Sequence, residues 1–142
     1  MTPLQPSQSS RKCVLVVDDD EATRAAIYYA LARQYRVTLA VDGCDGYTKA
    51  NEPPRPDLII AAAMLHLDVV TMARRIRENR LLCGIPIIFL TSPTSPTSLV
   101  ERLPAIRPFA FIPRPMPPYV LKERIESALG GAFEPTANDP CG

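Results

Sequence analysis

Residues 13–20 read Cys-Val-Leu-Val-Val-Asp-Asp-Asp, so an apolar run ends in three consecutive carboxylates. A continuous apolar run is typical of a strand that is covered on both faces of a parallel sheet. Carboxylates at the end of such a strand are costly unless a cation or hydrogen bonds satisfy them. A later run, Leu58-Ile59-Ile60, continues as Ala61-Ala62-Ala63, with no acid where a third carboxylate would join the cluster. The sequence therefore predicts a parallel sheet with an acidic site that is only half complete.

Apolar strands alternate with helical patterns along the rest of the chain, which predicts a parallel sheet built from βαβ units. Right-handed crossovers make this an α/β doubly wound fold, with its ligand crevice at the carboxyl ends of the strands. The fourth helix should be short because Pro104 must end it. The expected strands cover residues 13–17, 36–41, 58–63, 85–90 and 109–112, and the expected helices cover residues 21–34, 45–52, 69–79, 97–103 and 118–129.

A single domain, residues 12–130, should account for most of the 142 residues. Residues 1–11 are polar and contain proline and serine, which predicts a disordered lead-in, and residues 131–142 read as a flexible tail. The net charge of +1 implies no general attraction to nucleic acid or to an anionic membrane. No apolar run approaches the ~20 residues of a membrane span, and the N-terminus lacks a signal-peptide core, so we expect a cytoplasmic protein.

Four sequence landmarks occur in order along the chain. They read Val-Leu-Val-Val-Asp-Asp-Asp, Pro-Asp-Leu-Ile-Ile, Ile-Pro-Ile-Ile-Phe-Leu-Thr-Ser and Arg114-Pro115. In this order and spacing the chain resembles the receiver domain of bacterial response regulators, the phosphoacceptor module of two-component signalling, over about residues 12–130. The resemblance implies a flavodoxin-like sheet with strand order 2-1-3-4-5.

The resemblance also assigns roles to particular positions. In the family an acidic pair binds magnesium, an aspartate ending the third strand accepts a phosphoryl group from a histidine kinase, and a Thr or Ser and a lysine contact the phosphoryl oxygens. The positions that match here are Asp18 and Asp19 for the acidic pair, Thr91 for the hydroxyl, Phe111 for an aromatic switch position, Arg114 in place of the lysine and Ala62 in place of the acceptor.

Ala62 departs from the family pattern most seriously. Alanine has no oxygen nucleophile, so we predict no aspartyl-phosphate there and no catalytic residue. Asp57 precedes its strand and should lie about 15 Å from the acidic pair, at the opposite edge of the sheet. Asp68 is expected to cap the third helix. Neither acid replaces the missing acceptor.

The acidic pair itself should bind metal weakly or not at all. Magnesium held by only two carboxylates, at Asp18 and Asp19, is expected to bind weakly, so no cofactor is predicted beyond weak Mg²⁺. Arginine carries a planar fork that suits carboxylates, and we predict that Arg114 bridges to Asp18 or Asp19. A structural alternative is that the acidic run only caps the first helix.

These residues favour an atypical pseudo-receiver, a phosphorylation-independent interaction module rather than an enzyme. Its expected partners are proteins, such as a histidine kinase, another regulator, an output protein or a second copy of the chain. The alternative is a conventional phosphorylated receiver with an unusual acceptor. A flavodoxin-like cofactor binder is less favoured because the aspartate run stands where a Gly-rich phosphate loop would be. The expected interaction face, formed by the fourth helix, the fifth strand and the fifth helix, includes Leu99, Arg102, Phe109, Phe111 and Tyr119.

Overall fold

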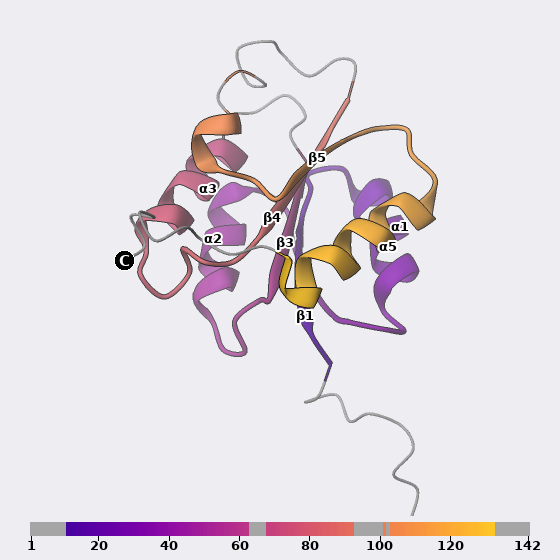
Figure 1. Cartoon of the computed structure of the whole chain (residues 1–142), viewed down its shortest axis with the longest axis horizontal. Helices are drawn as coiled ribbons and strands as arrows, with labels where there is room; N and C mark the ends of the chain where they lie inside the picture. The colour runs from indigo at the N-terminus through magenta and orange to yellow at the C-terminus, as the bar shows by residue number, and fades with distance from the viewer. Residues whose placement is uncertain (1–10, 63–67, 93–100, 102, 133–142) are drawn as a thin grey trace, which may run out of the picture.

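The centre of the molecule is a five-stranded parallel sheet with the order β2-β1-β3-β4-β5, which confirms the predicted topology. The computed structural model describes residues 11–62, 68–92, 101 and 103–132. In Figure 1 the sheet is seen nearly edge-on between two layers of helices. The strands are β1 (Cys13–Val17), β2 (Arg36–Ala40), β3 (Leu58–Ala62), β4 (Ile87–Thr91) and β5 (Ala110–Pro113).

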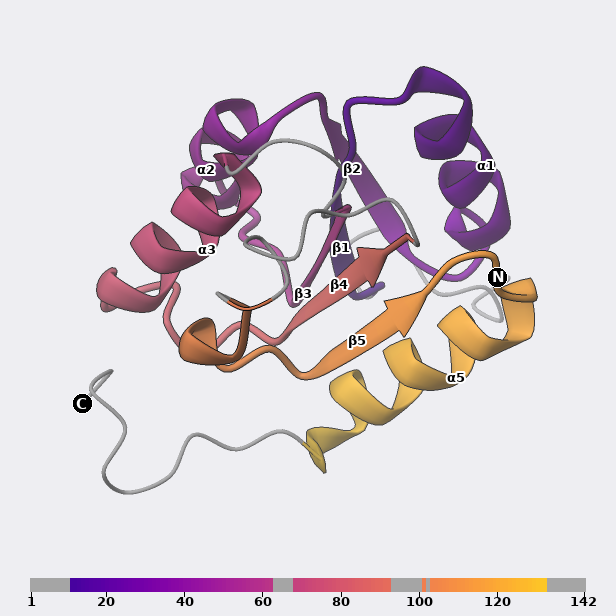
Figure 2. The ribbon, with the colours of Figure 1, turned by 90° about the horizontal axis from the view of Figure 1, so that it is seen from above.

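Helices of the described residues cover both faces of the sheet (Figure 2). On one face α1 (Glu21–Leu31) and α5 (Pro118–Ser127) pack side by side, and on the other face lie α2 (Gly43–Asn51) and α3 (Asp68–Glu78). The apolar strand residues alternate between the two layers, as a pleated strand requires. In β1, for example, Val14 and Val16 join the core beside α1 and α5, whereas Leu15 and Val17 join the core beside α2 and α3.

The helices that follow β1 and β2 begin with aspartate caps at the carboxyl edge of the sheet. Asp20 accepts a hydrogen bond from the amide of Thr23 at the start of α1, and Asp42 accepts one from the amide of Asp45 at the start of α2. These bonds satisfy amides that have no partner within the helix. The expectation that the aspartate run caps the first helix is therefore confirmed for Asp20.

Gly43 allows α2 to approach the beginning of α3 very closely. A Cβ atom at this position would lie 2.2 Å from the carbonyl oxygen of Asp68. Because that oxygen belongs to the backbone, a side chain could be accommodated only by moving the two helix starts apart. The glycine thus fixes the distance between the starts of α2 and α3, both of which border the acidic end of β1.

Arg77 is a buried charged residue of α3, with only 8% of its surface exposed. Its guanidinium donates hydrogen bonds to four backbone carbonyls, those of Ile106 (2.8 Å), Cys83 (2.9 Å), Ile85 (2.8 Å) and Arg107 (3.2 Å). One side chain therefore joins α3 to the segment before β4 and to the 3₁₀ turn η2 (Leu103–Ile106) that precedes β5. Arginine can do this because its planar group carries five donors.

Several predicted boundaries need correction. The fourth strand was predicted over 85–90 but covers Ile87–Thr91, and Pro104, predicted to end a helix, lies inside η2. The predicted tail boundary at 131 falls inside a π-helical turn, η3 (Ala128–Ala132), that extends α5. Arg11, placed in the predicted lead-in, donates a hydrogen bond from Nη1 to the carbonyl of Ala32 at 3.2 Å. Residues 1–10 and 133–142 and most of the predicted fourth helix, 97–103, lie outside the described residues.

Within the described part of the chain, none of the helices combines the length and the apolar character needed to cross a membrane.

Candidate functional site

A small cavity lies at the carboxyl end of the sheet, where β1 and β3 end next to each other. Its volume is about 40 Å³. The pairing of Val17 with Ala61 brings the residues that follow them, Asp18 and Ala62, to the same edge of the sheet. The cavity is lined by Val17, Asp18, Asp19, Asp42, Ala62, Asp68 and Val69. Three of the predicted positions, Asp18, Asp19 and Ala62, are thus brought together, and two further carboxylates join them.

Asp18 is the most buried of these acids, with 1% of its surface exposed. Its Oδ1 accepts a hydrogen bond from the amide of Asp20 at 2.9 Å, whereas its Oδ2 is buried and accepts none from the described residues. Burial raises the pKa of Asp18 above its ordinary value, and the hydrogen bond from Asp20 and the charge of Arg114 oppose this shift. The charged form of Asp18 is therefore only partly compensated.

Arg114 provides a positive charge next to that oxygen. Its Nη1 lies 3.6 Å from Oδ2 of Asp18, an ion pair in which the arginine side chain is 16% exposed. The backbone amide of Arg114 also donates to the carbonyl of Thr91 at 2.8 Å, which joins the ends of β5 and β4. The predicted bridge from Arg114 to Asp18 is confirmed. Thr91 is half-buried at the end of β4 and is not among the residues that line the cavity.

Ala62 presents no side-chain oxygen to the cavity. It ends β3, pairs with Leu90 of β4 and is 5% exposed. Asp57 lies at the opposite edge of the sheet, where its Oδ2 accepts a hydrogen bond from the amide of Cys13 at 2.8 Å. The prediction that Asp57 lies at the amino end is confirmed. The position that the resemblance assigns to the phosphoryl acceptor therefore has no nucleophile, and Asp57 does not supply one.

Asp42 and Asp68 belong to the cavity but were not predicted as site residues. Asp42 lies two residues after the end of β2, so an acid close to the carboxyl end of a parallel strand was the signal that could have identified it. Asp68 was expected to cap α3. Instead it is the first residue of α3, and its Oδ2 accepts a hydrogen bond from the amide of Gly43 at 2.8 Å. Its carboxylate therefore serves the start of α2.

The residues around the cavity do not fit a firmly bound magnesium ion. Mg²⁺ needs oxygen ligands in near-octahedral geometry and dehydrates reluctantly. Among residues 11–62, 68–92, 101 and 103–132, no group of three Asp, Glu, His or Cys side chains is arranged to hold a metal ion. Asp18 and Asp19 remain the candidate ligands, but the buried oxygen of Asp18 faces the guanidinium of Arg114. The cation and the arginine would compete for the same carboxylate.

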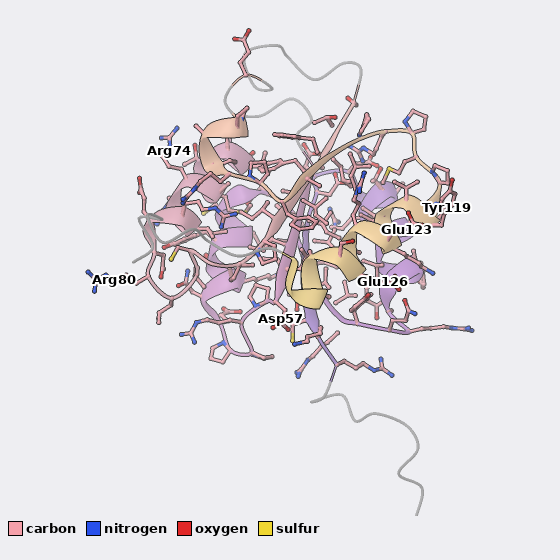
Figure 3. All side chains as sticks on the ribbon, in the orientation of Figure 1. Asp57, Arg74, Arg80, Tyr119, Glu123 and Glu126 are labelled. Atoms are coloured by element: carbon pink, nitrogen blue, oxygen red, sulfur yellow. The ribbon has the colours of Figure 1, made fainter. Side chains whose placement is uncertain are left out.

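The expected interaction face is described only in part. Phe111 on β5 is 44% exposed and Tyr119 on α5 is 63% exposed. Figure 3 labels Tyr119 at the outer end of α5. Phe109 is half-buried and packs against the core beside α1 and α5. Leu99 and Arg102 lie outside the described residues.

We expect Arg114→Ala to destabilise the protein in a pH-dependent way. The folded protein binds a proton at Asp18 more tightly than the unfolded chain does, so stability falls as the pH rises from the ordinary carboxyl pKa through the raised one. Removing Arg114 raises the pKa of Asp18 further and deepens that fall. Urea unfolding should therefore show a large loss at about pH 7 and a small one at about pH 4.

The control for this prediction is the same substitution in an Asp18→Asn background. The amide has no charge to compensate, so Arg114→Ala should then cost nearly the same at both pH values. An equal loss at both pH values in the Asp18 protein would show that Arg114 acts by packing instead.

No family model matches the chain. It is 36% identical over 118 residues to the transcriptional regulatory protein AfsQ1 of Streptomyces coelicolor, a match that covers 82% of this chain and 50% of that protein. It is also 39% identical over 83 residues to the alkaline phosphatase synthesis transcriptional regulatory protein PhoP of Bacillus subtilis, which covers 57% of this chain and 33% of that protein. The chain thus spans half or less of the length of these curated relatives.

Solved structures show the same architecture. The signal receiver domain of a modulated diguanylate cyclase from Desulfovibrio desulfuricans superposes with a TM-score of 0.72 at 28% identity, covering 85% of this chain and 95% of that one. The chemotaxis protein CheY4 of Vibrio cholerae superposes with a TM-score of 0.74 at 23% identity, covering 84% and 100%, and this likeness bears on the fold alone. The sheet order, the acidic carboxyl edge and these likenesses agree: the chain belongs to the receiver-domain family of response regulators.

Proposed function

We propose that this receiver domain works in two-component signalling as a phosphorylation-independent protein-interaction module. One observation carries the proposal, namely that Ala62 ends β3 at the wall of the acidic cavity. The transfer of a phosphoryl group to this position would need an oxygen nucleophile, and a methyl group has none. The ion pair of Arg114 with Asp18 supports the proposal, because it supplies a cation from the chain itself to the acid that metal would otherwise neutralise.

The surface through which the module would act is the face that includes β5 and α5. Exposed aromatic side chains such as Phe111 and Tyr119 offer large apolar area to a partner at low entropic cost. The proposed partners are a histidine kinase, another regulator, an output protein or a second copy of the chain. Direct binding of nucleic acid is not proposed, because the net charge is +1.

The proposal predicts that the protein does not respond to phosphoryl donors. After incubation with acetyl phosphate and Mg²⁺, intact-protein mass spectrometry should show no added phosphoryl group. Titration with beryllofluoride and Mg²⁺ should leave the amide spectrum around the acidic cavity unchanged, because neither the acceptor nor a firm metal site is in place. A saturable, magnesium-dependent adduct would overturn the proposal.

That adduct would favour the second candidate, a conventional receiver with an unusual acceptor. The curated relatives carry the names of transcriptional regulatory proteins, which is the observation that keeps this candidate open. The carboxylates of Asp19, Asp42 and Asp68 line the same cavity and would be the first positions to search for the modification. Peptide mapping of the adduct would identify the residue.

A further inference from the structure

A pocket lies between α1 and α5, which cover the same face of the sheet (Figure 2). Its volume is about 160 Å³, and eight of its eleven lining residues carry apolar side chains. We refer to it as the α1–α5 pocket. Its lining includes Ala26, Ile27, Ala30 and Leu31 of α1 and Leu121 and Lys122 of α5. The pocket is separate from the acidic cavity and plays no part in the function proposed above.

Two alanines leave this space open on the α1 side. Ala26 and Ala30 are four residues apart, so they lie on the same face of the helix, and each offers only a methyl group to the pocket. Ala26 is exposed and Ala30 is half-buried, so the pocket is open to solvent along α1. Met116 also lines it, and an unbranched thioether side chain can adjust to the shape of an occupant.

The size and the lining of the pocket fit one ring-sized apolar group. An apolar cavity of about 150 Å³ is large enough to hold a benzene molecule. The buried side chains of Ile27, Leu31 and Leu121 provide aliphatic surface for such a group. Because removal of apolar surface from water is favourable, a ring seated here would gain affinity from this contact alone.

The charged groups of the lining are both cations, and no carboxylate lines the pocket. Arg114 is one of them, but its guanidinium is already paired with Asp18, so we assign it no role in holding a ligand. Lys122 is half-buried, and within the described part of the chain its ammonium takes part in no hydrogen bond or ion pair. Glu126, one turn further along α5, is exposed and is not part of the lining. The ammonium of Lys122 is therefore available to an anionic group.

From the volume, the apolar lining and this available ammonium, we propose that the α1–α5 pocket binds a small organic acid with a ring-sized apolar body and a single carboxylate. The ring lies against Ile27, Leu31 and Leu121, and the carboxylate accepts a hydrogen bond from Lys122. The proposal is independent of whether the acidic cavity accepts a phosphoryl group.

A titration with sodium benzoate at constant ionic strength, followed through the amide chemical shifts of the protein, tests the proposal. Saturable shifts are expected at the amides of α1 and α5 that border the pocket. Sodium acetate carries the carboxylate without the ring and should cause no saturable shift there. Benzylamine carries the same ring with the opposite charge and should bind about fivefold more weakly or less.

Two variants locate the bound ligand, and each has a matched control. Ala26→Leu fills part of the pocket and should weaken benzoate binding about tenfold, whereas Ala22→Leu makes the same change at an exposed position of α1 outside the lining. Lys122→Gln removes the ammonium and should weaken binding about threefold, whereas Lys12→Gln removes an exposed lysine far from the lining in sequence. Both controls should bind benzoate as the unmodified protein does. Leucine is a good helix former, so the two α1 variants should remain folded.

Three results would each overturn the proposal. The first is a set of benzoate-induced shifts that do not saturate. The second is binding of acetate or benzylamine at the pocket that is as tight as that of benzoate. The third is an equal loss of affinity in the pocket variants and in their controls.

Discussion

Replacing Arg77 by alanine lowers the free energy of unfolding by about 3 kcal/mol or more, the largest loss that we expect from a single substitution outside the apolar core. The variant removes the donor of four hydrogen bonds to buried or half-buried carbonyls. Each hydrogen bond to a charged donor contributes roughly 1.5–3 kcal/mol, and a carbonyl left buried without a donor adds its own cost. Urea unfolding followed by circular dichroism measures the effect.

Two companion variants show whether the hydrogen bonds are responsible. Arg74→Ala removes an exposed arginine from the same helix and should change stability by no more than about 0.5 kcal/mol. Arg77→Lys keeps the charge but lacks the planar fork, so it should recover only part of the loss. Full recovery by lysine would mean that charge alone, rather than the four directed hydrogen bonds, holds α3 to η2.

Under the proposed function, replacing Ala62 by aspartate gives the chain an ability to take up a phosphoryl group that the natural sequence lacks. The new carboxylate would enter the cavity already lined by Asp18, Asp19, Asp42 and Asp68. Without metal, the added buried charge should lower stability by about 2 kcal/mol, because the carboxylate is desolvated beside other acids. Mg²⁺ should restore part of this loss, because a third carboxylate improves its ligand set.

The measurements are urea unfolding with EDTA or Mg²⁺, and intact-protein mass after incubation with acetyl phosphate and Mg²⁺. Ala62→Asn is the matched control, since it adds the same volume without a charge or a carboxylate nucleophile. It should show neither the metal effect nor the adduct. Adding Arg114→Lys to Ala62→Asp should increase the adduct, because it replaces the arginine that pairs with Asp18 by a point charge. If Ala62→Asp gains no phosphoryl group, the site lacks more than the acceptor.

The sheet could be predicted closely because its signals are local and strong. The run from Cys13 to Val17 is apolar throughout and ends in acids, and β1 covers the predicted residues. The end of α1 was predicted three residues too late, at 34 rather than Leu31. The residues that follow, Ala32 to Gln34, are good helix formers and give no stop signal, whereas the structure turns there through a bond from the amide of Gln34 to the carbonyl of Leu31.

The acidic site could be predicted where topology alone determines position. A parallel sheet brings the carboxyl ends of its strands to one edge. It therefore brings together Asp18, Ala62 and Arg114, each of which ends or follows a strand, independently of their side-chain conformations. The contact between Asp68 and Gly43 depends on how closely the starts of α3 and α2 approach each other. No repeating pattern in the sequence indicates that distance. Arg77 was missed for a similar reason. Arginine is mostly an exposed residue, and only the surrounding carbonyls show that this one is buried.

The ion pair of Arg114 with Asp18 has a consequence for what a cell could regulate through this protein. In a receiver whose acidic site is neutralised by a metal ion from solution, the signal can lie in the fraction of copies that are modified. Here the counter-charge is encoded in the chain and is present in every copy from the moment it folds. Under the proposed function, the variable that the pathway reads is then the number of copies, set by synthesis and degradation. The fraction of partner bound would then follow the abundance of this protein, which changes on the timescale of gene expression. It would not follow kinase activity, which acts over the lifetime of a phosphoryl group.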